Sequence, residues 1–136
     1  MIRLKVPGAL KYRDLAVRVV AAACKLVGDQ DEGDQKSWSD QVVSAFGEAF
    51  NNTAIHSFEG RTAGDVDIEI EIGRDYITIR VLDFGNSYDF TNVPLPDLDN
   101  LPESGMGIFI IRSFMDEVSY VAGAPNVLSM TKRVAT

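Results

Sequence analysis

Three polar side chains recur at four-residue intervals in one segment of this sequence. Glu48, Asn52 and His56 lie within EAFNNTAIH. Residues four apart share one face of an α-helix, so a helix here sets a carboxylate, an amide and an imidazole side by side. These groups can move a proton or bind a metal ion or an anion. The alternative is a polar outer face with i,i+4 hydrogen bonds.

The predicted helix that carries these residues also contains residue types of low helix propensity. Asn is a weak helix former, and Gly47 costs roughly 1 kcal/mol relative to Ala. Exposed helix faces more often use Lys and Glu. The pattern therefore favours a functional face over a merely solvated one.

Two further motifs suit a nucleotide. Asp83-Phe84-Gly85 combines an acceptor with a glycine that lets backbone approach a flat ligand, although it also fits an ordinary strand-end turn. Ser104-Gly105-Met106-Gly107 opens an apolar helix, where free N–H groups suit phosphate; the alternative is a hinge or cap. Ile110 stands where a dinucleotide fingerprint needs its third glycine, and the chain has no GxxxxGK[ST] P-loop.

Hydrophobic periodicity predicts the elements that position these motifs. The predicted strands are Ile2–Val6, Asp67–Ile72, Tyr76–Leu82, Val118–Val121 and Val127–Met130, with a hairpin turn at Gly73-Arg74-Asp75. The predicted helices are Ala9–Val27, Ser37 or Ser39 to about Phe58, and Gly107–Met115. The inward residues of the first helix are predicted as Leu15, Val19, Ala22 and Leu26, and those of the second as Trp38, Val42, Phe46, Ala49 and Thr53.

This order predicts an α/β (α+β) two-layer sandwich in which about three helices cover one face of a mixed, mainly antiparallel sheet. We expect one domain over residues 1–136, because 136 residues are about one domain's length. The segment 86–104 carries three prolines and no clear period, which is typical of a functional lid.

Composition excludes several function classes. The net charge of −7 disfavours nucleic acid and anionic membranes as partners. The chain has one cysteine, no apolar run long enough to span a membrane and no signal-peptide pattern, so we expect a soluble protein of the reducing cytoplasm.

The charge is unevenly distributed. Residues 1–25 hold six basic side chains and one acidic one, whereas the rest of the chain is strongly acidic. Lys11, Arg18 and Lys25 are seven apart and so line one edge of the predicted first helix. This edge is a candidate docking surface for an acidic partner; the alternative is a solvated helix face.

In order and spacing the three motifs resemble the GHKL ATPase superfamily, which has the histidine-kinase-like (Bergerat) ATPase fold. Within it the chain is most similar to the bacterial anti-sigma factor serine/threonine kinases, on EAFNNTAIH, GMGIFIIRSFMDEVSY and NVLSMTKRV. The resemblance covers nearly the whole chain. It implies the cofactors ATP and Mg²⁺ and an ATP lid over about 86–104.

The resemblance also implies residue roles. Glu48 would be the general base toward a partner's serine, and Asn52 would coordinate Mg²⁺. His56 would make a phosphate-side or lid contact, or hold a structural position. The nucleotide would contact Asp83 through the adenine amine, with Gly85 making room for the ring, and Gly105, Met106 and Gly107 through its phosphates.

The partners implied by the resemblance are a STAS-domain anti-anti-sigma protein and a sigma factor or similar regulator. Phosphorylation would switch between them and so regulate transcription. The basic first helix, with Lys11, Arg18 and Lys25, would contact those partners, and the protein would be a homodimer. Because this sequence has no phosphoacceptor-histidine helix, we expect a protein other than a complete sensor kinase.

The chain departs from the family pattern at three places. Ser87 stands where a second glycine is common, Glu103 where a basic residue is common, and Pro125-Asn126 where Gly-Thr is common. An alternative function is therefore a non-catalytic nucleotide-binding module that sequesters its partner without phosphoryl transfer. Another is a GHKL protein whose partner lies outside sigma-factor regulation.

Overall fold

The computed structural model describes residues 1–28, 32–60, 62–88 and 103–134, with residues 32 and 103–106 described as backbone alone. Its strands are β1 (Ile2–Pro7), β2 (Asp65–Ile72), β3 (Tyr76–Asp83), β4 (Glu117–Val121) and β5 (Asn126–Arg133). Its helices are α1 (Arg13–Cys24), α2 (Glu32–Asn52) and α3 (Glu103–Phe114), with a 3₁₀ turn η1 (Leu10–Tyr12) and a π-helical turn η2 (Thr53–Ser57).

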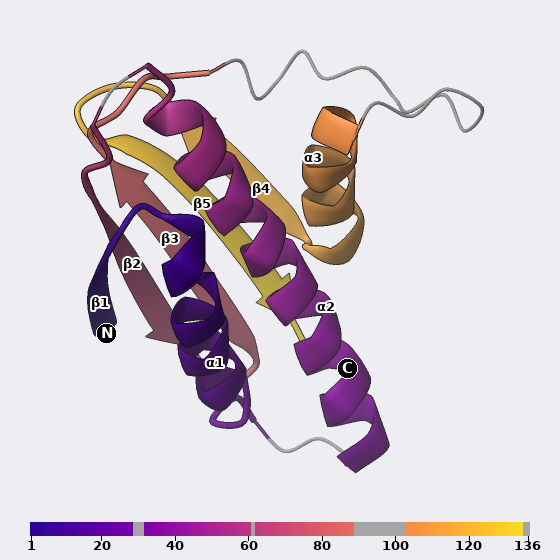
Figure 1. The fold of residues 1–136 in the computed structure, drawn as a ribbon. Coiled ribbons are helices and arrows are strands. Elements are labelled where there is room, and N and C mark those ends of the chain that lie inside the picture. The colour runs from indigo at the N-terminus through magenta and orange to yellow at the C-terminus, as the bar shows by residue number, and fades with distance from the viewer. Residues whose placement is uncertain (29–31, 61, 89–102, 135–136) are drawn as a thin grey trace.

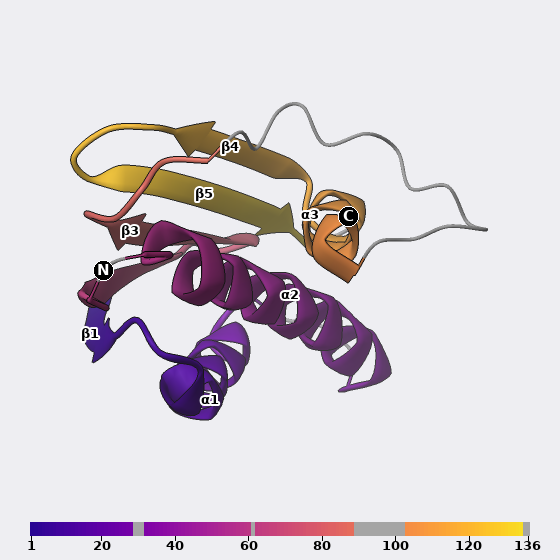
Figure 2. The same ribbon diagram turned by 45° about the horizontal axis from the view of Figure 1, so that its top comes forward.

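The five strands form one sheet in the order β1-β2-β3-β5-β4. The three helices lie together on one face of it (Figures 1 and 2). This confirms the predicted two-layer α/β sandwich. All four strand pairings among the described residues are antiparallel, so the sheet is simpler than the mixed one expected.

The alternating sequence of β2 explains its place in the sheet. Ile68 and Ile70 are fully buried under the helices, as predicted from the two-residue period. The charged residues between them face the other side of the sheet, where Glu69 pairs with Arg3 and Asp67 with Lys5 of β1. The hairpin turn before β3 is also confirmed, because Gly73 N donates to Tyr76 O at 2.9 Å.

Helix α2 runs through the middle of the helical layer (Figure 1). Its predicted inward residues Trp38, Val42, Phe46, Ala49 and Thr53 are all buried. The predicted start at Ser37 or Ser39 is wrong, because the helix begins at Glu32. An i,i+4 pair between Lys36 and Asp40 supports this added turn.

The predicted inward face of α1 is wrong by one position. Its buried residues are Ala16, Val20, Ala23 and Cys24, with Val27 just beyond the helix, whereas Leu15 and Leu26 are 51% and 66% exposed. Almost every residue from 15 to 24 is apolar, so periodicity does not fix the inward face. The small side chains of Ala16 and Ala23 suit a close approach to α2.

Helix α3 begins at Glu103 rather than Gly107, so the predicted lid overlaps its first residues. Residues 89–102, most of that lid, lie outside the described part of the chain. The described residues 86–88 lead away from the end of β3, toward the edge of the sheet where β4 lies.

Candidate functional site

The carboxyl-terminal half of α2 faces the first part of α3. Glu48 is half-buried there, and Asn52, about one helical turn further on, is buried. Gly107 of α3 lies opposite both: a Cβ on this glycine would sit 3.0 Å from Glu48 Oε2 and 3.5 Å from the amide oxygen and nitrogen of Asn52. The structure thus brings the E-x-x-x-N motif together with the second glycine motif.

The side-chain nitrogen of Asn52 is buried and has no hydrogen-bond partner among the described residues. Leaving a buried donor unsatisfied costs about 1–3 kcal/mol, so native proteins rarely do so away from sites that a ligand completes. Asn52 is therefore the described residue of this helix best suited to bind something other than protein.

The side chains near Asn52 are better suited to bind magnesium than a transition metal. No group of three or more His, Cys, Asp or Glu side chains converges anywhere in the described ranges. Mg²⁺ commonly takes one or two protein oxygens and completes its shell with water and substrate phosphates. The Asn52 amide oxygen suits this arrangement.

His56 does not continue the face shared by Glu48 and Asn52. The chain leaves α2 at Asn52 and forms η2, whose i→i+5 bonding breaks the four-residue alignment. The imidazole lies beside the ring of Tyr88, with 6.0 Å between the ring centroids. His56 therefore contacts the beginning of the predicted lid.

Tyr88 links His56 to the edge strand of the sheet. Its ring lies 4.7 Å from that of Tyr120 in β4, and its backbone N–H donates to the Tyr120 hydroxyl at 3.2 Å. Burial raises the pKa of both phenols, so both are neutral near pH 7. Neither tyrosine was singled out from the sequence, because nothing in their spacing shows that they meet.

Asp83 ends β3 at the same end of the molecule as the last turn of α2. The residue is 2% exposed, and its Oδ1 accepts hydrogen bonds from Gly85 N at 2.9 Å and Asn126 Nδ2 at 3.0 Å. No described group donates to the other oxygen, Oδ2. Among the described residues, the protein thus holds one carboxylate oxygen and offers no donor to the other.

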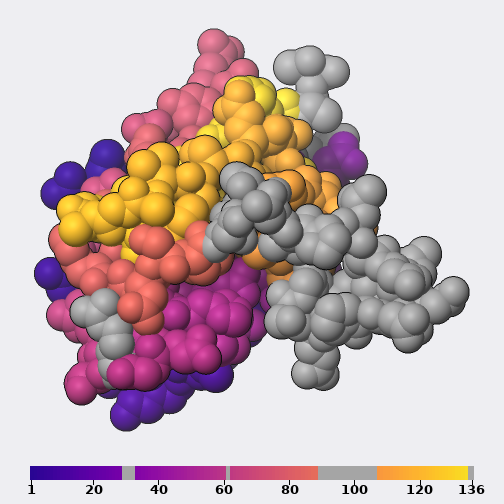
Figure 3. Space-filling model, turned by 90° about the horizontal axis from the view of Figure 1, so that it is seen from above, coloured from indigo at the N-terminus to yellow at the C-terminus, as the bar shows by residue number. Residues whose placement is uncertain are grey.

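Gly85 is required by packing against the end of α2, which is a separate constraint from the room for a ring that the resemblance implies. A Cβ at Gly85 would overlap the carbonyl of Ser57. The next residue, Asn86, donates its backbone N–H to the same carbonyl at 2.6 Å. Figure 3 looks onto this end, where residues 84–88 (coral) lie between the end of α2 (magenta) and the β4–β5 hairpin (yellow).

Gly105 and Met106 lie within the first turns of α3 rather than before it. Free N–H groups occur only in the first turn of a helix, so phosphate-facing donors would come from the backbone near Glu103–Gly105. Gly107 differs in that its missing side chain keeps α3 clear of Glu48 and Asn52.

The three predicted partner-binding residues are all exposed. Lys11 lies in η1 with its ammonium group 5.3 Å from the centre of the Tyr12 ring, and Arg18 pairs with Asp14 at 2.8 Å. Lys25 follows the last residue of α1. Gly47 is covered by the guanidinium group of Arg13, whose Nε donates to the Gly47 carbonyl at 3.4 Å, so its low helix propensity is explained by this close contact.

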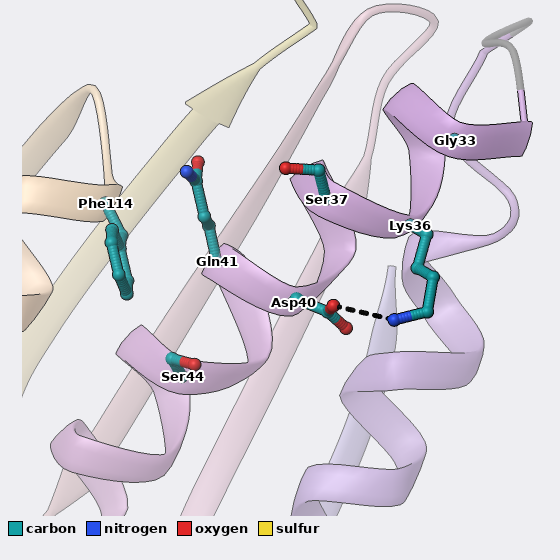
Figure 4. Close-up of a pocket in the computed structure, with 7 residues that line it drawn as sticks. All are labelled: Gly33, Lys36, Ser37, Asp40, Gln41, Ser44 and Phe114. Carbon is teal, nitrogen blue, oxygen red and sulfur yellow. Dashed lines mark hydrogen bonds and ion pairs between the residues drawn. The ribbon is translucent and has the colours of Figure 1, made fainter.

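A separate hollow of about 320 Å³ lies between the first half of α2 and the end of α3 (Figure 4). Its wall includes Gln41, Ser44 and Phe114, with the Lys36–Asp40 ion pair at its rim. It contains none of the residues predicted for the site. We therefore assign it no part in the chemistry.

Comparison with protein families identifies most of the chain. A family model described as a histidine kinase-like ATPase domain matches residues 10–132. That range holds Glu48, Asn52, Asp83, Gly107 and Asn126. None of the described helices is both long and apolar enough to cross a bilayer.

Individual relatives agree with the family match. A protein of Oceanobacillus iheyensis named serine-protein kinase RsbW is 25% identical over 142 aligned residues, which cover 98% of this chain and 87% of the relative. Proteins of the same name from Staphylococcus aureus strains JH9 and Newman are each 29% identical, over 98% of this chain and 86% of theirs. The resemblance to such kinases in the sequence is thereby confirmed.

Proposed function

Because the chain belongs to the histidine kinase-like ATPase domain family, we propose that it binds ATP with Mg²⁺ and transfers the γ-phosphoryl group to a serine or threonine of a protein partner. The observation that carries this proposal is the meeting of Glu48, Asn52 and Gly107. A base and an oxygen ligand for a cation occur there together, against a facing helix that has no side chain at the point of contact.

Glu48 is the general base in this proposal. Its carboxylate accepts the proton of the partner's hydroxyl group as that oxygen attacks the γ-phosphorus, and the bond to the β,γ-bridging oxygen breaks to release ADP. When bound at Asn52, Mg²⁺ supplies charge neutralisation for the phosphates. The half-buried position of Glu48 keeps its carboxylate within reach of a partner while limiting access of water.

The base of the nucleotide would be recognised at Asp83, whose Oδ2 accepts from the adenine amine. The phosphates would lie at the start of α3, where the free N–H groups are those near Glu103–Gly105; Met106 and Gly107, which the resemblance also implies, follow directly in the helix. Such a site suits a protein of net charge −7, because backbone N–H groups and a metal ion bind phosphate without basic side chains. His56 would contact the phosphates or the lid, in which Tyr88 is its described neighbour.

The proposed partners are a STAS-domain anti-anti-sigma protein, as phosphoacceptor, and a sigma factor or similar regulator that the protein sequesters. The exposed side chains of Lys11, Arg18 and Lys25 offer a basic surface to an acidic partner. We further propose that the protein acts in the cytoplasm as a homodimer. Reversing the three charges together should weaken partner binding, chiefly by lowering the association rate, and unchanged affinity would remove this surface from the proposal.

Phosphoryl transfer is tested with γ-labelled ATP and a STAS-domain partner. The wild type should label a serine or threonine, and Glu48→Gln should lower the rate by about 100-fold or more while ATP still binds. Asp40→Asn, an exposed carboxylate on the same helix, is the matched control and should leave the rate unchanged. Binding of ATP and partner without label transfer would establish the non-catalytic binding module instead.

A further inference from the structure

Asn126, the first residue of β5, is fully buried beside Asp83. The two residues are direct partners in the β3–β5 register. The Asn126 side-chain nitrogen donates to Asp83 Oδ1 at 3.0 Å and to the carbonyl oxygens of Gly85 and Asn86 at 3.0 and 3.3 Å. One amide group therefore links the carboxylate to the backbone of the turn that follows it.

The orientation of this amide is fixed by its neighbours. Its oxygen accepts from the backbone N–H of Gly123 at 3.0 Å and from the hydroxyl of Ser87 at 2.5 Å. A backbone N–H can only donate and a carbonyl can only accept, so the nitrogen must face Asp83. A flipped amide would lose several of these bonds at once.

This arrangement determines what Asp83 presents to a ligand. Oδ1 already accepts from Gly85 N and Asn126 Nδ2, whereas Oδ2 accepts nothing from the described residues. A carboxylate held by one oxygen keeps a single orientation. Its free oxygen is then a preorganised acceptor for one amino group.

We propose that Asn126 is a positioning residue for base recognition: it holds Asp83 so that Oδ2 selects purines with an amino group at position 6. This inference rests on the proposed binding of ATP. The inference also connects two positions at which this chain departs from the family pattern. Ser87 stands where a glycine is common and Asn126 where a threonine is common, and their side chains are hydrogen-bonded to each other.

The test compares the affinities for ATP and for purine riboside triphosphate, which lacks the 6-amino group. Wild type should prefer ATP by about tenfold or more, the effect of one hydrogen bond to a charged group. Asn126→Val should bring the two affinities within about threefold of each other. Asn126→Thr has the same shape as the Val variant but keeps a donor, and should retain most of the preference.

Control variants separate positioning from general stability. Thr131→Val removes the 2.7 Å Thr78–Thr131 hydrogen bond from the same pair of strands and should leave the affinity ratio unchanged. If Asn126→Val fails to fold, Ser87→Ala replaces it, because it removes one of the two groups that hold the amide; its ratio should fall by about threefold.

Two results would overturn the inference while ATP binding stands. One is that Asn126→Val prefers ATP over purine riboside triphosphate as strongly as the wild type does. The same result in Ser87→Ala counts where that variant replaces it. The other is an equal loss of affinity for both nucleotides, which a merely structural residue would give. A wild-type protein that binds neither nucleotide would instead overturn the proposed function, and the inference with it.

Discussion

Gly107 of α3 lies so close to Glu48 of α2 that a methyl group on the glycine would come within 3.0 Å of the Glu48 carboxylate. The same methyl group would touch the Asn52 amide at 3.5 Å. A base and a candidate metal ligand thus face a helix that has no side chain at that point. This close approach of the Glu48 and Asn52 side chains to the backbone of α3 is the central feature of the proposed site.

Gly107→Ala should separate function from stability. Alanine is better than glycine in a helix by about 1 kcal/mol, and the end of the Glu48 side chain can move, so the free energy of unfolding should not fall by more than about 1 kcal/mol. ATP affinity and phosphoryl transfer should fall by about tenfold or more, because the methyl group displaces the carboxylate. Urea unfolding and calorimetry measure the two effects.

The matched control for that variant is Gly33→Ala. Gly33 is a glycine of α2 near which a Cβ would meet nothing within 4 Å. It should change neither ATP binding nor transfer. An unchanged rate of phosphoryl transfer in Gly107→Ala would contradict the role given to the close approach of Glu48 to α3.

Gly85→Ala, in contrast to Gly107→Ala, should chiefly destabilise the fold. The added Cβ would overlap the Ser57 carbonyl, a backbone atom that cannot move without shifting η2. We expect a loss of about 2 kcal/mol or more in the free energy of unfolding, measured in urea. Gly123→Ala, whose Cβ would make an ordinary 3.5 Å contact with Pro125, should cost less than about 1 kcal/mol; equal losses would refute this packing explanation.

Asn52→Leu should stabilise the protein or leave its stability unchanged. The substitution removes a buried nitrogen that has no partner among the described residues, and replacing it with an apolar group should raise the free energy of unfolding by up to about 1 kcal/mol. Asn126→Leu removes a buried amide that is fully bonded, and should cost about 2 kcal/mol or more. Comparable losses in the two variants would show that Asn52 is a structural residue.

The free energy of unfolding should depend on Cys24 at alkaline pH. Burial raises the pKa of this thiol from 9.0 to about 11. A thiol whose pKa is higher in the folded state stabilises the fold fully below pH 9, and that contribution is lost as the pH rises to 11. Wild type should therefore lose about 2 kcal/mol relative to Cys24→Ala between pH 9 and 11 in urea unfolding; parallel pH profiles would contradict this.

The sequence predicts the sheet well and the surface of α1 poorly. Strict alternation in Asp67–Ile72 leaves only one face that can be buried, so the inward isoleucines are unambiguous. Helix α1 is apolar on most sides, and its inward face depends on how closely it approaches α2. That distance is a tertiary property, which is why exposed Leu15 and Leu26 were placed in the core.

The candidate site was predictable where it follows the spacing along one element. Glu48 and Asn52 are such a pair, whereas their place in one site with Gly107 was implied only by the resemblance to the family. Asn126 lies 43 positions from Asp83, and only strand register brings the two together. His56 departs from its predicted face because the π-helical turn changes the helical repeat, which periodicity does not show.

Calorimetric titration with ATP, in magnesium and then in excess chelator, tests the central claim most directly. The account predicts that the wild type binds one ATP per chain in magnesium and loses about tenfold or more of its affinity in chelator, and that Asn52→Ala loses this magnesium dependence while remaining folded. A folded wild type that binds no ATP, or an Asn52→Ala variant with wild-type affinity and magnesium dependence, would contradict it.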